Sequence, residues 1–376
     1  MSNNDQELRI AFVADTVVTA RGAGGVVAAH QFVDKLRETC SVTLVGADAY
    51  GEPHVCLAAF QIPLKAMKSS GFKMAWPARK VLARVFAQVD VVHLTFPFLL
   101  SIVALSEARK ARRPVVSWFL VQPENILMNL GIRSPVLSRL MYSFLIKRLY
   151  NRSDLVLCTT MFAERKLREH GLTSRSLVVS CGVSPDMIPG DYERAPEHRG
   201  FFLIVMVGRL SPEKNQECLI EAVHRSRYRE RIKVVIAGHG PREEALKKLA
   251  SKLAHETEVG FVSRERLRQL LSTADLFVHC SQVELEGIAV LEAMSMGAPV
   301  LVAQGEHTAA GEFALNDSFG FEAGNVDDLS KKIDHLIEDP EALACARESY
   351  QAMARTMSFE SSVAKLEQAY RDVAFE

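Results

Sequence analysis

Two glutamates in the segment ELEGIAVLE, Glu284 and Glu292, are the residues best spaced for chemistry in this sequence. Seven residues separate them, and Gly287 lies between them. If Glu284 lies on a loop and Glu292 on the following helix, both carboxylates can face one pocket at the carboxyl end of a strand. There the N–H groups of residues 287–290 would hold an anion at the start of the helix. The alternative is that Glu284, Glu286 and Glu292 form a solvated acidic face.

Two basic residues in the segment GRLSPEKN, Arg209 and Lys214, directly follow a predicted buried strand. We expect both side chains to point into the same cleft. A guanidinium fork and a compact ammonium charge together suit the binding and neutralisation of a diphosphate. The alternative is a basic turn exposed to solvent. A third segment, AGHGPREE, places Gly238 and Gly240 at a strand-to-helix turn, which by itself is weak evidence for a nucleotide site.

The elements that must position these residues form two series of short apolar strands, each alternating with helical segments. The predicted strands cover 9–14, 41–47, 89–94, 113–121, 153–159 and 176–182 in the first half, and 201–208, 233–240, 258–262, 276–281 and 298–303 in the second. Because alternation of this kind is typical of doubly wound parallel sheets, we predict an α/β protein with two Rossmann-like domains. Ligands of such sheets bind at the carboxyl ends of the strands, so two sheets facing each other would form an interdomain cleft.

The predicted domain limits follow from a polar, Pro- and Gly-rich stretch between the two series. We place the N-terminal domain at 1–185, the linker at 186–200 and the C-terminal domain at 201–357. The final amphipathic segment, 358–376, is expected to cross back to the N-terminal domain.

Composition narrows the class of protein further. The chain has 376 residues with 48% hydrophobic content, which favours two packed cores and excludes disorder. Seven scattered cysteines indicate a reducing, cytoplasmic compartment. The N-terminus lacks the basic and apolar regions of a signal peptide, and no apolar stretch reaches the length of a membrane span.

Taken together, the motifs resemble those of the GT-B glycosyltransferases, in particular glycosyltransferase family 4, the group 1 retaining enzymes. The segments that carry the resemblance are GRLSPEKNQECLIEAV, VVIAGHGP, STADLFVHCS and ELEGIAVLE with its continuation LEAM-x-x-G-x-PV. The resemblance covers the whole chain, because the first domain also opens with a strand and a Gly-rich loop. It implies a retaining hexosyltransferase that uses a nucleoside diphosphate sugar, with a UDP-sugar expected rather than a GDP-sugar.

The resemblance also implies that the N-terminal domain binds the acceptor and the C-terminal domain binds the donor, and it implies roles for particular residues. Arg209 and Lys214 would grip the diphosphate, Glu284 would approach the donor sugar, and Glu292 would bind the ribose. The catalytic set is then Arg209, Lys214 and Glu284. The remaining donor-binding positions are Gly24, Gly25, Gly208, Gly238, Gly240, Phe261, Val262, Gly287, Ile288 and Ala289. No metal or other cofactor is expected, because the chain contains no D-x-D and its basic pair can supply the positive charge.

Some positions depart from the family pattern. Leu285 follows the first glutamate where Gly is common, a variant seen in a bacterial subset that also carries the segment QPEN. That segment is present here as Gln122, Glu124 and Asn125 around Pro123, and we assign these three to the acceptor side. The subset has a His where Leu120 stands. His93 is a possible substitute on the acceptor side, although a single His at a strand end is more often structural.

Charge is distributed unevenly along the chain. The whole sequence has a net charge of zero, yet residues 60–152 hold fifteen basic residues against three acidic ones. The segments GFKMAWPARKVLARVF and SRLMYSFLIKRLY in this region fit basic amphipathic helices, which suit an anionic membrane surface. The alternative is that their apolar residues are core and their charges only solvate the outer face. Nucleic acid is not expected as a partner.

The sequence therefore predicts a glycosyltransferase that is cytoplasmic or peripheral on the cytoplasmic face of the membrane. Its acceptor would be lipid-linked, as in glycolipid or polysaccharide precursor synthesis. The alternative is a soluble transferase that modifies a small molecule or secondary metabolite, since one fold supports several acceptors through loop changes. Two alternatives are not glycosyltransferases: a nucleotide-sugar epimerase and an inactive binding module.

Overall fold

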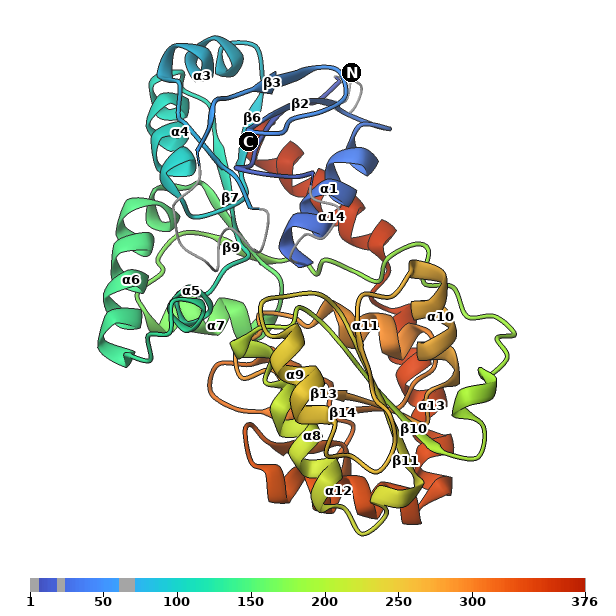
Figure 1. Ribbon diagram of the computed structural model, residues 1–376. Coiled ribbons are helices and arrows are strands. Elements are labelled where there is room, and N and C mark those ends of the chain that lie inside the picture. Colours follow the sequence, from blue (N-terminus) through green and yellow to red (C-terminus); the bar gives the residue numbers. More distant parts are fainter. Residues whose placement is uncertain (1–6, 19–23, 61–71, 376) are drawn as a thin grey trace. The chain divides into compact units, whose positions relative to one another are not determined.

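The protein is described by a computed structural model that covers residues 7–18, 24–60 and 72–375. It divides into two compact units, Met1–Cys181 with Glu360–Glu376, and Gly182–Phe359. Each unit is built on a parallel sheet with helices packed against it (Figure 1). The prediction of two Rossmann-like α/β domains is therefore confirmed.

The sheet of the first unit has the strand order β3-β2-β1-β6-β7-β8-β9, and all pairings are parallel. Its strands are β1 (Arg9–Val13), β2 (Ser41–Gly46), β3 (His54–Cys56), β6 (Val91–Leu94), β7 (Val115–Phe119), β8 (Leu155–Cys158) and β9 (Ser176–Val178). The central strands β6, β7 and β8 are buried along their whole length, as expected for strands covered on both faces. A short antiparallel pair, β4 (Ala59–Phe60) and β5 (Met74–Ala75), lies outside this sheet.

The helices of the first unit follow its strands in the expected alternation. They are α1 (Gly24–Leu36), α3 (Arg79–Phe86), α4 (Leu99–Lys110), α5 (Pro123–Asn129), α6 (Pro135–Arg148) and α7 (Met161–Glu169). Among the described residues, no helix of the protein combines the length and the apolar character that crossing a bilayer requires.

The sheet of the second unit has the order β12-β11-β10-β13-β14-β15, again all parallel. Its strands are β10 (Phe202–Val207), β11 (Ile232–Ala237), β12 (Glu258–Gly260), β13 (Leu276–His279), β14 (Val300–Gln304) and β15 (Gly320–Glu322). Its helices are α8 (Gln216–Arg225), α9 (Glu243–Ala250), α10 (Arg264–Thr273), α11 (Ile288–Ser295), α12 (Val326–Glu338) and α13 (Pro340–Arg355). The strand order reverses direction at β10, which is the kind of switch point where such sheets bind ligands.

The segment predicted as a linker, 186–200, is packed onto the second unit. Asp186 accepts hydrogen bonds of 2.6 and 2.7 Å from the guanidinium of Arg264 on α10, and Met187 is buried in the core of that unit. The division between the units falls after Cys181 rather than at 185. The composition of this segment predicted a linker, but the ion pair of Asp186 and the burial of Met187 hold it against the second unit.

The last helix, α14 (Phe359–Phe375), leaves the second unit and packs on the first. Tyr370 on this helix is buried, and its hydroxyl group lies 2.8 Å from Nδ1 of His93 on β6. Thr39 at the end of α1 donates a hydrogen bond of 2.8 Å to Glu367. The first unit is therefore completed by residues that come after the whole of the second unit in sequence.

Candidate active site

Three neighbouring strands of the second sheet bring the predicted donor-site segments to one edge. Strand β10 lies between β11 and β13, and all three run parallel. Their carboxyl ends therefore open at the same edge, where the loops beginning at Gly208, Gly238 and Cys280 emerge. The three segments singled out in the sequence thus meet because of the sheet order.

Gly238 and Gly240 allow the turns after β10 and β11 to pack closely. A Cβ atom at Gly238 would lie 1.9 Å from the carbonyl oxygen of Gly208, and one at Gly240 would lie 2.3 Å from that of Leu210. Both separations are far inside van der Waals contact, so only glycine fits at these two positions. The two glycines thereby shape the loop that carries Arg209.

Lys214, Glu284 and His279 form a charged cluster at this edge. The ammonium group of Lys214 makes a short ion pair with the carboxylate of Glu284. Nε2 of His279 lies 3.3 Å from the same carboxylate oxygen and 3.1 Å from the hydroxyl of Ser281. The two charged side chains are 19% and 17% exposed, so the pair is shielded from bulk water but remains open to a ligand.

The surroundings of Glu284 keep its carboxylate ionised. Burial favours the protonated acid, but Lys214 and the hydrogen bond from His279 outweigh it and hold the pKa of Glu284 well below its ordinary value. Burial in turn lowers the pKa of His279, which is neutral at pH 7 and donates its Nε2 hydrogen. Glu284 is therefore an acceptor of hydrogen bonds at this site and cannot serve as a proton donor.

Arg209 is held in place by an acid buried beneath it. Its guanidinium donates a hydrogen bond of 2.7 Å to Glu213, which is 1% exposed and also accepts 2.7 Å from the hydroxyl of Ser211. Gln216 donates to the carbonyl oxygen of Arg209 at 2.8 Å. Burial opposes the charge on Glu213, but Arg209 and Ser211 lower its pKa overall. The result is a guanidinium that is oriented before any ligand arrives.

The loop between the two glutamates turns into helix α11 at Gly287. This residue has a φ of 92°, a left-handed conformation that favours glycine, and it precedes Ile288 as the N-cap position. Ile288 and Ala289 open the helix, where backbone N–H groups have no acceptor within the helix itself. The predicted helix start is thus present, with Glu284 on the preceding loop and Glu292 one turn further along; anion binding there stays a prediction.

Glu292 is tied to a second basic residue that lies on α10. Its carboxylate lies 2.8 Å from the guanidinium of Arg264, which also binds Asp186. Burial raises the pKa of Glu292 despite the opposing effect of Arg264. The two glutamates of ELEGIAVLE therefore lie in opposite electrostatic environments, one favouring its charge and the other disfavouring it.

Phe261 and Val262 follow the edge strand β12, whose carboxyl end lies at the same edge of the sheet. Gly260 pairs in register with Ala237 of β11, and its carbonyl oxygen accepts a hydrogen bond of 2.8 Å from the amide of Gly238. The side chain of Phe261 is 64% exposed. The position fits a residue that lies beside a nucleotide base.

In the first unit, Gly24 and Gly25 begin helix α1, and Gly25 adjoins Leu120. A Cβ atom placed on Gly25 would be 3.7 Å from the Cβ atom of Leu120, an ordinary van der Waals distance. The apolar Leu120 thus lies against the start of α1, at the position where the sequence comparison suggested a His. Gly22, in the same glycine-rich stretch, lies outside the described residues.

The residues of the QPEN segment open helix α5 and are fixed by α6. Gln122 is buried, whereas Glu124 and Asn125 are half-buried. Glu124 accepts hydrogen bonds from the hydroxyls of Ser138 and, at 3.1 Å, Tyr142. Through these hydrogen bonds, Glu124 ties the start of α5 to α6.

His93 lies in the core, and the structure contradicts its assignment to the acceptor side. The residue is fully buried, stacks on Phe12 with a ring-centroid separation of 4.2 Å, and is hydrogen-bonded to Tyr370. Burial lowers the pKa of His93 to about 3, so its ring is neutral. Because solvent does not reach it, the structural alternative is correct for this residue.

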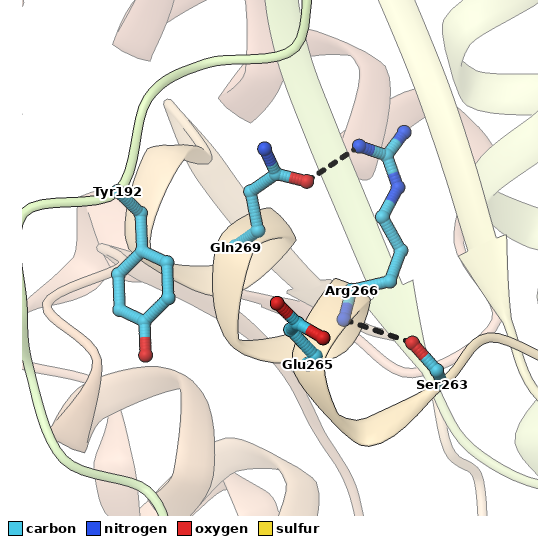
Figure 2. A pocket seen from close by; sticks show the side chains of 5 residues that line it. All are labelled: Tyr192, Ser263, Glu265, Arg266 and Gln269. Atoms are coloured by element: carbon cyan, nitrogen blue, oxygen red, sulfur yellow. Dashed lines mark hydrogen bonds between the residues drawn. The ribbon is translucent and has the colours of Figure 1, made fainter.

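A hollow lies beside the first half of α10, next in sequence to Phe261 and Val262. It is lined by Tyr192, Ser263, Glu265, Arg266 and Gln269 (Figure 2). Arg266 donates 2.7 Å to Gln269 and 2.9 Å to Glu197, so its charge is already engaged. No residue predicted to bind the donor lines this hollow.

Sequence reasoning missed three residues that support the site, namely Glu213, Arg264 and His279. Glu213 had a usable signal, because it follows Arg209 by four residues within the same motif. His279 ends the strand before Glu284, but only the fold shows its Nε2 turning toward that carboxylate. Arg264 lies on another helix, and nothing in the local sequence links it to Glu292.

Two family models match the chain. The model described as Glycosyltransferase Family 4 matches residues 22–187, and the one described as Glycosyl transferases group 1 matches residues 192–355. The two matches are adjacent and together take in most of both units. They confirm the resemblance that the motifs indicated.

Several known proteins are similar to the chain. An alpha-monoglucosyldiacylglycerol synthase of Streptococcus pneumoniae is 22% identical over 254 residues, which cover 64% of this chain and 57% of that protein. A GDP-mannose-dependent alpha-mannosyltransferase of Mycolicibacterium smegmatis is 27% identical, with 78% and 79% covered. The solved structure of Anabaena HepE with UDP-glucose has a TM-score of 0.74 at 18% identity, with 97% and 100% covered, and shows the shared GT-B fold. The chain thus spans little more than half the length of the pneumococcal relative.

The contrast between Glu284 and Glu292 predicts opposite effects of one isosteric change. Glu284→Gln leaves Lys214 without its carboxylate in a shielded site, and we expect a loss of about 3 kcal/mol. Each kcal/mol corresponds to a Tm decrease of about 2–4 °C in a unit of this size. Glu292→Gln removes a charge that burial disfavours, so its Tm should equal or exceed that of the parent protein. Thermal unfolding followed by circular dichroism compares the two, and equal destabilisation by both changes would contradict the assignment.

The lowered pKa of Glu284 also predicts how the effect depends on pH. A carboxyl whose pKa is lower in the folded state stabilises the fold above its unfolded pKa, which is about 4.3, and that stabilisation is lost as the pH falls below it. The Tm difference between the parent and Glu284→Gln should therefore be constant from pH 7 to about 5 and shrink on further acidification. A difference that stayed constant down to pH 3 would show that the charge of Glu284 does not account for it.

Proposed function

We propose that this chain, which belongs to the family 4, group 1 glycosyltransferases, transfers a hexose from a nucleoside diphosphate sugar with retention of the anomeric configuration. The proposal depends on one observation: at the carboxyl edge of the second sheet, one loop carries both Arg209, which pairs with Glu213, and Lys214, which pairs with Glu284. This edge combines two fixed positive charges with the carboxylate of Glu284, which stays ionised.

Arg209 and Lys214 would act on the leaving group. As the bond between the anomeric carbon and the phosphate oxygen breaks, negative charge grows on the diphosphate, and positive charges fixed nearby stabilise that transition state. Arg209 is already oriented by Glu213. Lys214, now paired with Glu284, would contact the diphosphate while keeping its carboxylate partner.

Glu284 would contact the donor sugar as a hydrogen-bond acceptor. Its lowered pKa leaves it without a proton to donate, so it suits sugar hydroxyl groups rather than the leaving oxygen. The departing phosphate oxygen would accept the proton of the acceptor hydroxyl on the same face of the sugar. The new bond then forms on the face from which the leaving group departs, and the configuration is retained.

The nucleotide would be held by Glu292 and by the residues around it. A carboxylate accepts hydrogen bonds from both ribose hydroxyls, and the ion pair with Arg264 offsets part of the effect of burial on Glu292. Phe261 would lie beside the base. We propose a UDP-sugar as donor, in line with the UDP-glucose held by the HepE structure, whereas the mycolicibacterial relative is named for GDP-mannose. No metal ion is required in this proposal, because Arg209 and Lys214 supply the positive charge.

The acceptor is proposed to be lipid-linked and presented at the cytoplasmic face of a membrane. The pneumococcal relative is named for a diacylglycerol glycolipid, and another relative from Arabidopsis thaliana is a sulfoquinovosyl transferase. The excess of basic residues over 60–152 would favour an anionic surface, each such residue near it contributing up to about 1 kcal/mol. Of these basic residues, Lys65 and Lys68 lie outside the described part of the chain.

Donor binding can be tested by thermal shift with UDP, GDP, ADP and their glucose or mannose conjugates. A ligand at 100 times its Kd stabilises the fold by about 2.7 kcal/mol. We expect the largest shift with a UDP compound, a loss of that shift in Lys214→Met, and no effect of EDTA. Lys248→Met, which changes an exposed lysine on α9, is the matched control and should behave as the parent. Equal shifts for Lys214→Met and the parent would contradict the proposed diphosphate site.

The acceptor class can be tested by following labelled sugar. The protein is incubated with the radiolabelled donor and membrane lipids, and the products are divided between organic and aqueous phases. We expect label in the organic phase, with an α linkage in the proton NMR spectrum when the donor is an α-linked nucleotide sugar. Label transferred only to water-soluble acceptors would instead favour the soluble transferase, and a β-linked product would contradict retention.

A further inference from the structure

Helix α6 of the first unit exposes a line of large apolar side chains. Val136, Leu140 and Phe144, at a spacing of four residues, are 71%, 60% and 52% exposed. We call these three residues the α6 ridge. The turn before the helix adds Leu130 and Ile132, both also exposed. Figure 1 shows α6 on the outer side of the first unit, with α5 against it.

The side chains of the α6 ridge are exposed although the helix itself packs firmly on the first unit through its opposite face. The opposite face of α6 buries Ser138, Tyr142, Leu145 and Ile146. Pro135 opens the helix, and the hydroxyl of Ser134 caps it by accepting a hydrogen bond from the amide of Leu137. The ridge is thus held outward by packing on the other side. Helix α3 differs, because Leu82 and Phe86 are buried and Val81 and Val85 are half-buried, so the core-facing alternative is correct for the helix itself. Trp76, which precedes the helix in the same predicted segment, is exposed.

The charges beside the ridge have one sign. Helix α6 contains no acidic residue, and its basic residues Arg139, Lys147 and Arg148 are exposed, as is Arg133 in the preceding turn. Exposed apolar side chains between basic ones are the pattern of helices that lie in the interface of an anionic bilayer. An isolated apolar residue needs no explanation, but an aligned group of this kind does.

We infer that the α6 ridge inserts into an anionic lipid bilayer, with the flanking arginines and lysine at the level of the headgroups. This inference rests on the proposed function and adds the element by which the protein meets its lipid-borne acceptor. A second copy of the chain fits the ridge less well. A symmetric dimer would bring the same patch from both copies together, and with it two sets of like charges.

Docking through α6 would also set the position of the acceptor-side segment. Ser138 and Tyr142 on the inner face of this helix donate to Glu124 at the start of α5. The QPEN segment is therefore attached to the helix that contacts the bilayer, on the side facing away from the lipid. Membrane binding would thus hold Gln122 and Asn125 at a fixed depth relative to the headgroups.

Sedimentation with vesicles made of equal parts phosphatidylglycerol and phosphatidylcholine tests the inference on the full chain. The double variant L140S/F144S should bind about tenfold more weakly or worse, because two apolar side chains no longer insert. Lys147→Gln with Arg148→Gln should weaken binding at low salt and leave little difference at high salt. Ile188→Ser, which alters an equally exposed apolar residue of the second unit, is the matched control and should bind as the parent. All three variants should keep the parent Tm, since the changed side chains are exposed.

A second readout places the ridge in the lipid directly. Phe144→Trp should show a blue-shifted emission on addition of the vesicles, whereas Ile188→Trp should not. Unchanged vesicle binding by L140S/F144S, or no shift for Phe144→Trp, would overturn the inference. The inference would also be overturned if the parent protein sedimented as a dimer without vesicles and L140S/F144S sedimented as a monomer. Slow hydrolysis of the donor sugar in water reports separately on the proposed function, and it should be the same in L140S/F144S and the parent.

Discussion

The pair formed by Lys214 and Glu284 is the interaction on which the site depends. It joins the loop after β10 to the loop after β13, and those strands are neighbours only because the order of the sheet reverses at β10. Neither residue tolerates burial alone, so each needs the other in place. The close packing at Gly238 and Gly240, the buried Glu213 under Arg209 and the hydrogen bond from His279 all serve to keep these loops where the pair can form.

The two glutamates of the site differ in the direction in which the fold shifts their pKa values. Glu284 has a basic partner and a hydrogen-bond donor, so its charge is stable, whereas Glu292 is buried with one arginine that is shared with Asp186. The first is suited to a role next to developing positive charge on a sugar. The second is suited to gaining new hydrogen-bond donors from a ligand. Two identical side chains eight positions apart in sequence thereby come to lie in opposite electrostatic environments.

Much of this arrangement could be predicted from sequence, because strand ends and glycine turns are local features. The two parallel sheets, the loop with Arg209 and Lys214, and the helix start at Gly287 follow from apolar runs and the residues after them. Contacts between distant segments could not be predicted in this way. Arg264 contacts Glu292 from another helix. From the sequence, His93 could have served as an acceptor-site residue, but in the fold α14 packs over it through Tyr370. In α6, periodicity showed an amphipathic helix, but only the packing of Tyr142 showed which apolar residues face outward.

The return of α14 to the first unit has a consequence for biosynthesis. Tyr370 and Glu367 leave the ribosome only after the whole second unit has been made, yet they complete the contacts of His93 and Thr39 near the beginning of the chain. Until α14 has been made, the first unit therefore lacks the contacts that cover His93 and engage Thr39 in the finished fold. Domains usually fold in the order of their synthesis. Here the unit that is translated first is the one that finishes last.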